Sequence, residues 1–298
     1  MILLLLVSLI WAASFSLIKT HLVAVAPDVV NGLRLWLTLA VFLPFLRGKG
    51  LGGRRIAGLM ALGALQFGLM YALYTRSYGA LKAYEVALAT VMTPLYVTLL
   101  DDLLERRLRL RFLASALLAA LGTAVSLGVL STGFGSVSTR GLLLVQGANL
   151  CFAVGQIAYR RLLDRSPGLS NLQAFPWCAL GAALVATLFA LPALFRGGFP
   201  SLSPTQWGVL AYLGVVASGL CFFLWNAGAR QVNTGTLAVM NDLKIPLGML
   251  VAFLFFGEQA PWPRLSAGLA LIGLALALAA IREKARPKGG LPGSASTT

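Results

Sequence analysis

Residues 2–20 of the chain read ILLLLVSLIWAASFSLIKT, a run in which Lys19 carries the only charge. An α-helix of about 20 apolar residues spans the roughly 30 Å hydrocarbon core of a bilayer. Because a backbone in lipid must satisfy its own N–H and C=O groups, this run predicts a transmembrane helix. A cleaved signal peptide is the alternative, although the charged segment that usually precedes its apolar core is missing here.

Further runs of the same kind follow along the 298 residues, so the sequence predicts an all-α integral membrane protein with ten transmembrane helices. The runs are continuous, which excludes the alternating strands of about ten residues that build a transmembrane barrel. The predicted helices are Ile2–Thr20, Val29–Leu46, Ile56–Tyr74, Tyr84–Leu100, Leu110–Leu130, Gly141–Tyr159, Leu172–Phe195, Trp207–Trp225, Thr236–Phe256 and Leu265–Ile281.

The composition excludes several other classes of protein. Only 11% of the residues are charged, whereas a soluble domain carries about 25%. The net charge is +15, but the basic residues form short clusters between apolar runs, so we expect a lipid bilayer and not a nucleic acid as partner. The three cysteines lie inside apolar runs without metal-ligand spacing, and we expect neither a metal nor a cofactor.

The basic residues also predict the orientation, because Lys and Arg collect on the cytoplasmic side of a membrane. Six lie on the side of the odd-numbered connections, at Lys19, Arg76, Lys82, Arg140, Arg196 and Arg264. Sixteen lie on the other side: Arg47, Lys49, Arg54, Arg55, Arg106, Arg107, Arg109, Arg111, Arg160, Arg161, Arg165, Arg230, Arg282, Lys284, Arg286 and Lys288. We therefore expect a multi-pass protein of the inner membrane with both termini in the cytoplasm.

The chain repeats itself weakly. The segment Trp11–Lys19 aligns with Phe152–Arg160 at an offset of 141, and Pro94 has a counterpart in Pro246. Two units of five helices have opposite orientations, since five is odd, and inverted repeats of this kind are typical of secondary transporters. We expect one repeat over 1–130, a second over 131–282 and a disordered tail over 283–298.

The last helix of each half carries a stripe of small residues at alternating spacings of four and three. Such stripes let helices approach closely. They predict either packing within one chain or the contact of a homodimer. The stripes are Ser115, Ala119, Gly122 and Ser126, and Ser266, Ala270, Gly273, Ala277 and Ala280.

Several short motifs, taken in order, make the chain resemble the EamA-type drug/metabolite transporters. They are the opening Trp11-Ala-Ala-Ser14, Leu33-Arg34 in the second helix and Phe256-Gly257-Glu258 after the ninth. Trp225-Asn226-Ala-Gly228 is similar to exporters of the YddG type, which move aromatic and other amino acids. Leu104-Glu105 stands where a second Gly-Glu would be expected and departs from the pattern. The resemblance implies export of small metabolites by alternating access through a central cavity between the repeats, and it does not fix the substrate. We expect amino acids, including aromatic ones, with a multidrug or other metabolite exporter of the same fold as the alternative.

Lys244 stands out because an ionisable residue within a membrane span is costly and is by default a functional candidate. It lies about nine residues into its predicted helix, which is near the middle of the bilayer. Asn241 shares its face, and Pro246 removes the N–H that would bond the Asp242 carbonyl. The sequence predicts that Lys244 binds an anionic group of the substrate. The alternative is a structural salt bridge from Lys244 to an acid on another helix, with Asp242 as a plausible participant.

Arg34 and Glu85 lie at the same outer level of the second and fourth predicted helices. A structural ion pair is one interpretation, because an unpaired buried charge is costly. The alternative is an outer gate that opens during transport. Glu85 and Asp242 are also the candidates for carrying a proton, although transport by facilitated diffusion is equally open.

Polar and aromatic side chains within the spans predict the lining of the cavity. For the tyrosines an interfacial belt is the alternative, and for the amides it is hydrogen bonding between helices. The predicted substrate-binding residues are Trp11, Gln66, Tyr74, Tyr78, Asn149, Gln156, Trp225, Asn241 and Lys244.

An intramembrane enzyme is the hypothesis from another class. The chain has one histidine, His21, which excludes the zinc motif H-E-x-x-H. Neither a nucleophile elbow nor a phosphate-binding loop occurs, so we expect no catalytic residues and no ATP-driven transport. A passive channel remains open, although no repeated carbonyl loop or ring of charges marks a selectivity filter. We expect a secondary exporter of small molecules.

Overall fold

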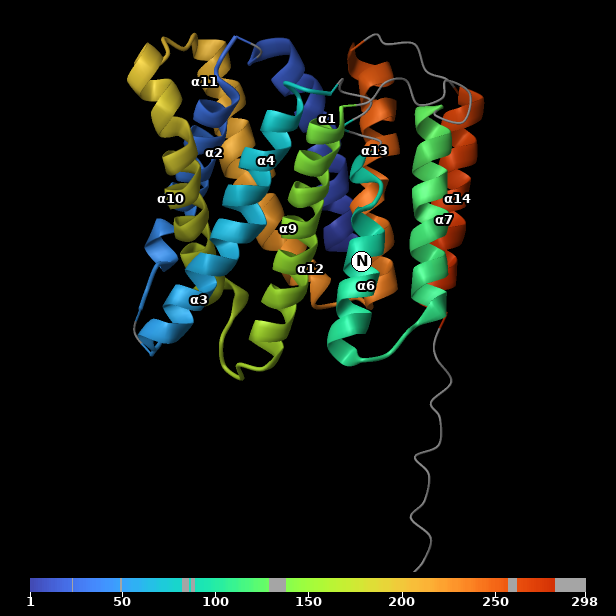
Figure 1. The fold of residues 1–298 in the computed structure, drawn as a ribbon. Coiled ribbons are helices and arrows are strands. Elements are labelled where there is room, and N and C mark those ends of the chain that lie inside the picture. The colour runs from blue at the N-terminus through green and yellow to red at the C-terminus, as the bar shows by residue number, and fades with distance from the viewer. Residues whose placement is uncertain are drawn as a thin grey trace, which may run out of the picture.

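The computed structural model describes residues 1–298 except 23, 49, 82–85, 87–88, 129–137, 257–261 and 282–298. At residues 13, 15, 16, 19, 127, 252 and 256 it describes the backbone alone. Within these ranges the regular structure is entirely helical (Figure 1). The all-α class predicted from the sequence is confirmed. The boundary expected at residue 130 and the tail expected from residue 283 lie outside the described residues.

In the described part of the chain, contiguous elements join into ten helical stretches, and each overlaps one of the ten predicted runs. Seven of them are long and apolar enough to cross a membrane. The elements are α1 (Ile2–His21), α2 (Pro27–Phe42), η1 (Leu43–Phe45), α3 (Gly53–Gly63), η2 (Ala64–Leu69), α4 (Met70–Ser77), α6 (Thr93–Glu105), α7 (Leu110–Leu127), α9 (Thr139–Asp164), α10 (Asn171–Gly197), α11 (Pro204–Ala211), η3 (Tyr212–Leu220), α12 (Cys221–Ala229), α13 (Thr234–Phe256) and α14 (Trp262–Ala280).

Side-chain caps fix the starts of two helices. The N–H of Gln173 donates to Ser170 Oγ at 3.2 Å, and the N–H of Ser170 donates to Gln173 Oε1 at 3.0 Å. The same reciprocal pair forms between Ser203 and Gln206 ahead of α11. These capping boxes satisfy donors that the first turn of a helix otherwise leaves without partners.

A turn interrupts the fourth predicted helix. The hydropathy pattern predicts one run from Tyr84 to Leu100, whereas the structure has helical residues at 86, 89 and 90, then a turn at residues 91 and 92, and then α6 from Thr93. Pro94 explains the break, because it has no N–H to bond the carbonyl four residues earlier and is favoured in the first helical turn. Tyr84 itself lies outside the described residues.

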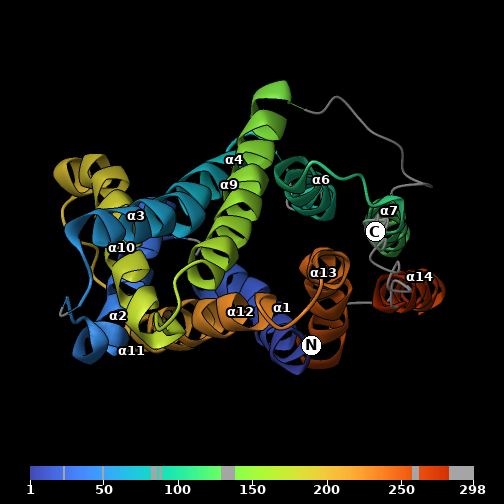
Figure 2. The ribbon, with the colours of Figure 1, turned by 90° about the horizontal axis from the view of Figure 1, so that it is seen from below.

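Contacts made by helices of the first half have counterparts among the contacts made by helices of the second half. α1 packs on α12 and α13, and α9 packs correspondingly on η2, α4 and α6. α2 packs on η3, while α10 packs on α3 and η2. Three pairs join helices of equal rank in the two halves: α2 with α10, α6 with α13, and α7 with α14. Figure 2 shows α7 and α14 together at one end of the bundle and α2, α3 and α10 at the other. This is the pattern that the predicted twofold relation between the halves would produce.

The third helix of each half contains π-helical backbone at mid-length. η2 lies between α3 and α4, and η3 lies between α11 and α12. In a π-helix each hydrogen bond spans five residues in place of four, and such segments occur frequently at functional sites. The two segments therefore mark equivalent places in the two halves where the regular helix is interrupted.

Two glycines set the close crossing of α3 and α10. A Cβ on Gly63 would overlap the carbonyl of Cys178, and a Cβ on Gly181 would overlap the carbonyl of Met60. The two backbones are thus in direct contact, which a side chain at either glycine would prevent.

The small-residue stripe of the fifth helix, α7, packs against another helix of the same chain. Ser115, Ala119 and Ser126 are buried on α7, and a Cβ on Gly122 would lie 2.8 Å from the Gly268 carbonyl oxygen of α14. The stripe predicted on the last helix faces outward instead, because α14 packs through a different face. Its exposed members are Ser266, Ala270, Gly273, Ala277 and Ala280. A homodimer stays a prediction.

The connections that carry the basic clusters lie at one end of the bundle. Figure 1 shows the start of α3 and the α6–α7, α9–α10 and α12–α13 connections all at its lower end. We call this the basic end. It holds Arg54, Arg55, Arg106, Arg107, Arg160, Arg161, Arg165 and Arg230.

Reporter fusions should place the basic end in the cytoplasm, because the excess of Lys and Arg marks the side that is not translocated. Fusions after Leu46 and after Arg165 are expected to report a cytoplasmic location, and a fusion after Phe199 a periplasmic one. The reverse pattern would contradict the predicted orientation of both termini.

Candidate functional site

Lys244 lies in the middle of α13, and its ammonium faces two aromatic rings. Nζ lies 5.4 Å from the ring centre of Trp11 on α1 and 5.5 Å from that of Phe152 on α9. These are the first residues of the two aligned repeat segments, so the rings come from equivalent positions of the two halves. A cation at this distance is attracted to the ring faces.

Lys244 makes no ion pair with Asp242 or with any other acid whose side chain the structure describes. Asp242 is fully buried, and neither of its carboxylate oxygens has a hydrogen-bond partner. The two side chains therefore leave α13 in different directions, as expected for residues two apart on a helix. Among the side chains that the structure describes, the salt-bridge alternative to substrate binding therefore does not form.

Trp11 joins Lys244 to a cluster of aromatic rings. Its ring centre lies 5.0 Å from that of Trp225 and 5.4 Å from that of Phe222, both on α12. Trp11 Nε1–H donates to the carbonyl of Ala217 at 2.7 Å. Ala217 belongs to η3, so the π-helical segment supplies the acceptor that fixes the indole.

The predicted amide residues bond one another across helices. Gln66 Nε2 donates to Asn226 Oδ1 at 2.9 Å, and Asn226 Nδ2 donates back at 3.4 Å, which links the third helices of the two halves. Trp225 Nε1 donates to Gln156 Oε1 at 3.0 Å. Gln156 and Asn241 exchange two long hydrogen bonds of 3.5 Å. All five are fully buried, in agreement with the interhelical alternative for the amides.

Gly155 makes room for this network. A Cβ at this position of α9 would overlap the side chain of Gln66. The Gln66–Asn226 pair therefore depends on a glycine from a third helix. Asn226 was not among the predicted site residues, although it lies in the Trp225-Asn226 motif that carries the resemblance to exporters.

The remaining predicted lining residues bond to other partners. Asn149 Nδ2 donates to the Ala89 carbonyl at 2.9 Å, just before the break that precedes α6. Tyr78 donates to the Tyr74 hydroxyl at 3.1 Å, and Tyr78 is 43% exposed. The exposed ring of Tyr78 suits an aromatic belt at the membrane interface.

Arg34 is held by neutral partners. Its Nη2 donates to the Tyr71 hydroxyl at 2.8 Å and to Ser218 Oγ at 3.0 Å, and the guanidinium lies 4.6 Å from the Tyr71 ring centre. Its Nε is buried without a partner. Glu85, the predicted counter-ion, lies outside the described residues.

A network of charged side chains lies at the basic end of the bundle. Asp101, buried near the end of α6, accepts hydrogen bonds from Arg109 and Arg161 at 2.7 Å each and from the Thr234 hydroxyl. Asp102 accepts from Arg109 Nε at 2.6 Å. The network thus joins α6 to the starts of α7 and α13 and to the end of α9.

The opposite charges of this network stabilise one another. Burial opposes the charge of Arg109, but its hydrogen bonds to Asp102 and Asp101 raise the pKa of the guanidinium above its ordinary value. Sequence reasoning counted these arginines for orientation only and missed the network. The adjacent acids Asp101 and Asp102, inside an otherwise apolar run, were the signal that could have revealed it.

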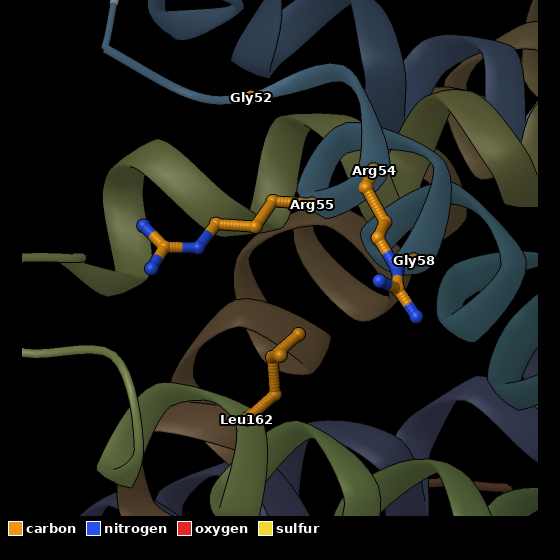
Figure 3. A pocket seen from close by; sticks show the side chains of 5 residues that line it. All are labelled: Gly52, Arg54, Arg55, Gly58 and Leu162. Carbon is orange, nitrogen blue, oxygen red and sulfur yellow. The ribbon is translucent and has the colours of Figure 1, made fainter.

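The structure describes a pocket of about 520 Å³ at the basic end, between α3 and the end of α9. Figure 3 shows Arg54 and Arg55 extending from the start of α3 in different directions, with Leu162 of α9 opposite them. Gly52 and Gly58 complete the lining. None of the predicted substrate-binding residues lines this pocket.

Comparison with known proteins decides the family. The model of the EamA-like transporter family matches residues 1–128 and 139–281. The chain belongs to this family. The EamA-like assignment confirms the resemblance predicted from the sequence, and it makes the chain a secondary transporter of the membrane and not an enzyme.

Two curated relatives within this family are close. The chain is 42% identical over 274 residues to a probable biotin transporter of Pseudomonas aeruginosa, with 90% of this chain and 93% of that one covered. It is 40% identical over 280 residues to the biotin transporter of Escherichia coli K12, at 91% and 90% coverage.

Two more distant likenesses bear on substrate and fold. The aromatic amino acid exporter YddG of Ancylobacter novellus is 28% identical over 193 residues, which cover 63% of either chain. A crystal structure that is 23% identical superimposes with a TM-score of 0.77 and covers 94% of this chain and 96% of its own, which shows the shared fold.

Proposed function

We propose that this EamA-like transporter carries biotin and that Lys244 binds its carboxylate. The observation that carries the proposal is an ammonium group in the middle of the bundle, between Trp11 and Phe152, with no described acid as partner. The names of the 40–42% identical relatives support the choice of substrate.

The chemistry of biotin fits these residues. Biotin carries one carboxylate on a flexible apolar chain that ends in a neutral cyclic urea. A carboxylate bound to Lys244 would neutralise its ammonium group, a charge that otherwise costs about 2.5–3.5 kcal/mol at mid-membrane. The Trp11 and Phe152 rings offer apolar surface to the chain, and the buried amides Gln156 and Asn241 are hydrogen-bonding groups of the kind that a urea requires.

Amino acids, aromatic ones included, are the second candidate. The sequence favours them through the resemblance to exporters, and the relative YddG supports them. Their carboxylate suits Lys244 equally well. Their α-ammonium would need an acid beside the carboxylate site, and Asp242, the acid nearest in sequence whose side chain is described, leaves α13 in a different direction from Lys244. We therefore rank biotin first.

Counterflow in liposomes tests the choice of substrate. Vesicles containing the purified protein and unlabelled biotin should take up labelled biotin from outside. Added unlabelled biotin should compete, whereas its methyl ester should compete at least about tenfold more weakly, since it lacks the charge that Lys244 binds. Competition by tryptophan or phenylalanine without competition by biotin would support the amino-acid candidate. Equal competition by the ester would contradict the role of Lys244.

Alternating access requires that one end of the bundle be closed at a time. We propose that the Asp101 network is the closed gate at the basic end. It joins helices of the first half, α6 and α7, to helices of the second half, α9 and α13. Separating the halves at this end therefore requires these contacts to break.

Asp101→Asn should open the basic end more often. Loss of one charge-assisted hydrogen bond, at about 1.5–3 kcal/mol, shifts the opening equilibrium by at least roughly tenfold. Hydrogen exchange should rise in peptides that cover residues 101–109 and 234–240. Asp164→Asn is the matched control, because it breaks the exposed pair with Arg230 at the same end. Equal exchange in the two variants would contradict the gate.

A further inference from the structure

We propose that Asp242 binds a proton that travels together with the solute, so that transport is coupled to a pH gradient. The inference rests on the proposed function, because it uses Lys244 as the site of the solute carboxylate. It assigns a role to a buried carboxyl group that solute binding alone does not use.

Asp242 is buried as a carboxyl group without a partner. It has no exposed surface, and both oxygens lack a hydrogen bond in the described structure. The Thr123 hydroxyl of α7 lies near Asp242 but donates to its own helix, to the Ala119 carbonyl at 3.1 Å. An ionised carboxylate in such a place is strongly disfavoured, whereas a neutral carboxyl group is tolerated. The conformation seen here is therefore one in which Asp242 holds a proton.

Lys244 is the charged group that acts on Asp242 from mid-membrane. The other described charged or titratable groups on helices packed against α13 lie toward the helix ends. They are Asp101, Asp102 and Glu105 late in α6, Arg111 at the start of α7, Arg264 at the start of α14, and the N-terminal amine and His21 at the two ends of α1. Tyr96, the fourth residue of α6, is titratable as well, and its hydroxyl donates to Gln146 Oε1 at 2.9 Å. Asp242 lies eight residues beyond Thr234, or about 12 Å along the helix from the Asp101 network.

Two carboxylates cannot both be neutralised by one ammonium group. When Asp242 is ionised, it balances the charge of Lys244, and a solute carboxylate would add an unpaired negative charge. When Asp242 is protonated, Lys244 is left for the solute. Proton and solute anion therefore favour one another's binding, and this coupling is reciprocal.

The cycle needs no other reactant. A proton from water forms the O–H bond of the Asp242 carboxyl group, and the same bond breaks when the site faces water on the other side. Solute and proton then leave together, because ionised Asp242 competes for Lys244. With the outside more acidic, this coupling drives the solute inward, opposite to the export that the family resemblance implies.

Liposomes with an imposed pH gradient test the coupling. The membrane potential is held at zero with potassium and valinomycin, labelled biotin is added outside at acidic pH, and a trapped pH dye reports the interior. We expect biotin to accumulate up to about tenfold per unit of pH difference, for one proton per biotin anion. The interior should acidify when biotin is added, beyond the acidification of protein-free vesicles.

Asp242→Asn should remove the stimulation by the gradient, because an amide cannot bind and release a proton at these pH values. Asp164→Asn is the control and should keep the stimulation, since Asp164 is a half-exposed surface residue paired with Arg230. An Asp242→Asn protein that accumulates biotin as well as the wild type would overturn the inference.

The wild-type measurements separate the two proposals. Counterflow of biotin without gradient stimulation or proton movement would overturn the proton site and leave the proposed function standing. Absence of biotin counterflow would overturn the proposed function itself. Because proton movement is measured on the wild type, the inference can fail even if the Asp242→Asn variant does not fold.

Discussion

Lys244→Met should weaken biotin binding by about 10- to 150-fold. The variant loses a charge-assisted hydrogen bond worth about 1.5–3 kcal/mol, and every 1.4 kcal/mol corresponds to a factor of ten. Methionine is apolar and of similar length, so the protein should remain inserted and should melt no lower than the wild type. The half-saturation concentration for biotin counterflow and the melting temperature measure the two effects.

Two further variants control this result. Lys244→Arg should restore binding only in part, because a planar guanidinium differs in shape from a compact ammonium. Arg76→Met removes another cation that lies over an aromatic ring, 4.4 Å from the centre of Phe189, and should leave biotin affinity unchanged. Wild-type affinity in Lys244→Met would rule out the binding role. A destabilised Lys244→Met that is rescued by Asp242→Asn would favour the structural salt bridge.

Gly181→Ala should destabilise the folded protein by about 1–3 kcal/mol or more, the cost of overpacking a tight contact. Its new Cβ would overlap the carbonyl of Met60, which is backbone and cannot move without shifting α3. Gly63→Ala should act in the same way against Cys178 from the other side of the crossing. Thermal melting of the purified proteins in detergent measures both.

Gly273→Ala is the matched control for this prediction. It lies inside α14 with no atom within 4 Å of the position that a Cβ would take. Alanine is favoured over glycine in a helix by up to about 1 kcal/mol, so this variant should melt at the wild-type temperature or higher. If Gly181→Ala had the same melting temperature as Gly273→Ala, α3 and α10 would not be in contact through their backbones.

The sequence predicted the helices well because hydropathy reports the membrane directly. Each apolar run overlaps a helical stretch, since a backbone in lipid has few alternatives. The turn at residues 91 and 92 was missed because hydropathy does not register the hydrogen bond that Pro94 removes. Whether the α14 stripe packs within the chain or faces outward was left open for a related reason: spacing shows that residues share a face but not which neighbour that face meets.

The candidate site was predictable as a set of residues and not as a set of pairs. Gln66, Gln156 and Asn241 stand out as polar groups in apolar runs. Which of them bond to one another depends on the relative positions of helices that are far apart in the sequence. These positions cannot be read from a single sequence. Asn226 shows this, because it matters as the partner of Gln66 more than through its own helix. The role of Lys244 as a binding residue remains a prediction.

The π-helical segments η2 and η3 have a practical consequence for mapping these helices by labelling. A π-helical turn holds more residues than an α-helical one, so the angular phase of the residues beyond it is shifted. A helical wheel drawn from Gly53 through Ser77 would assign the faces of α3 and α4 in two incompatible registers. Accessibility data from cysteine scanning should therefore be indexed separately before Ala64 and after Leu69, and likewise on either side of η3.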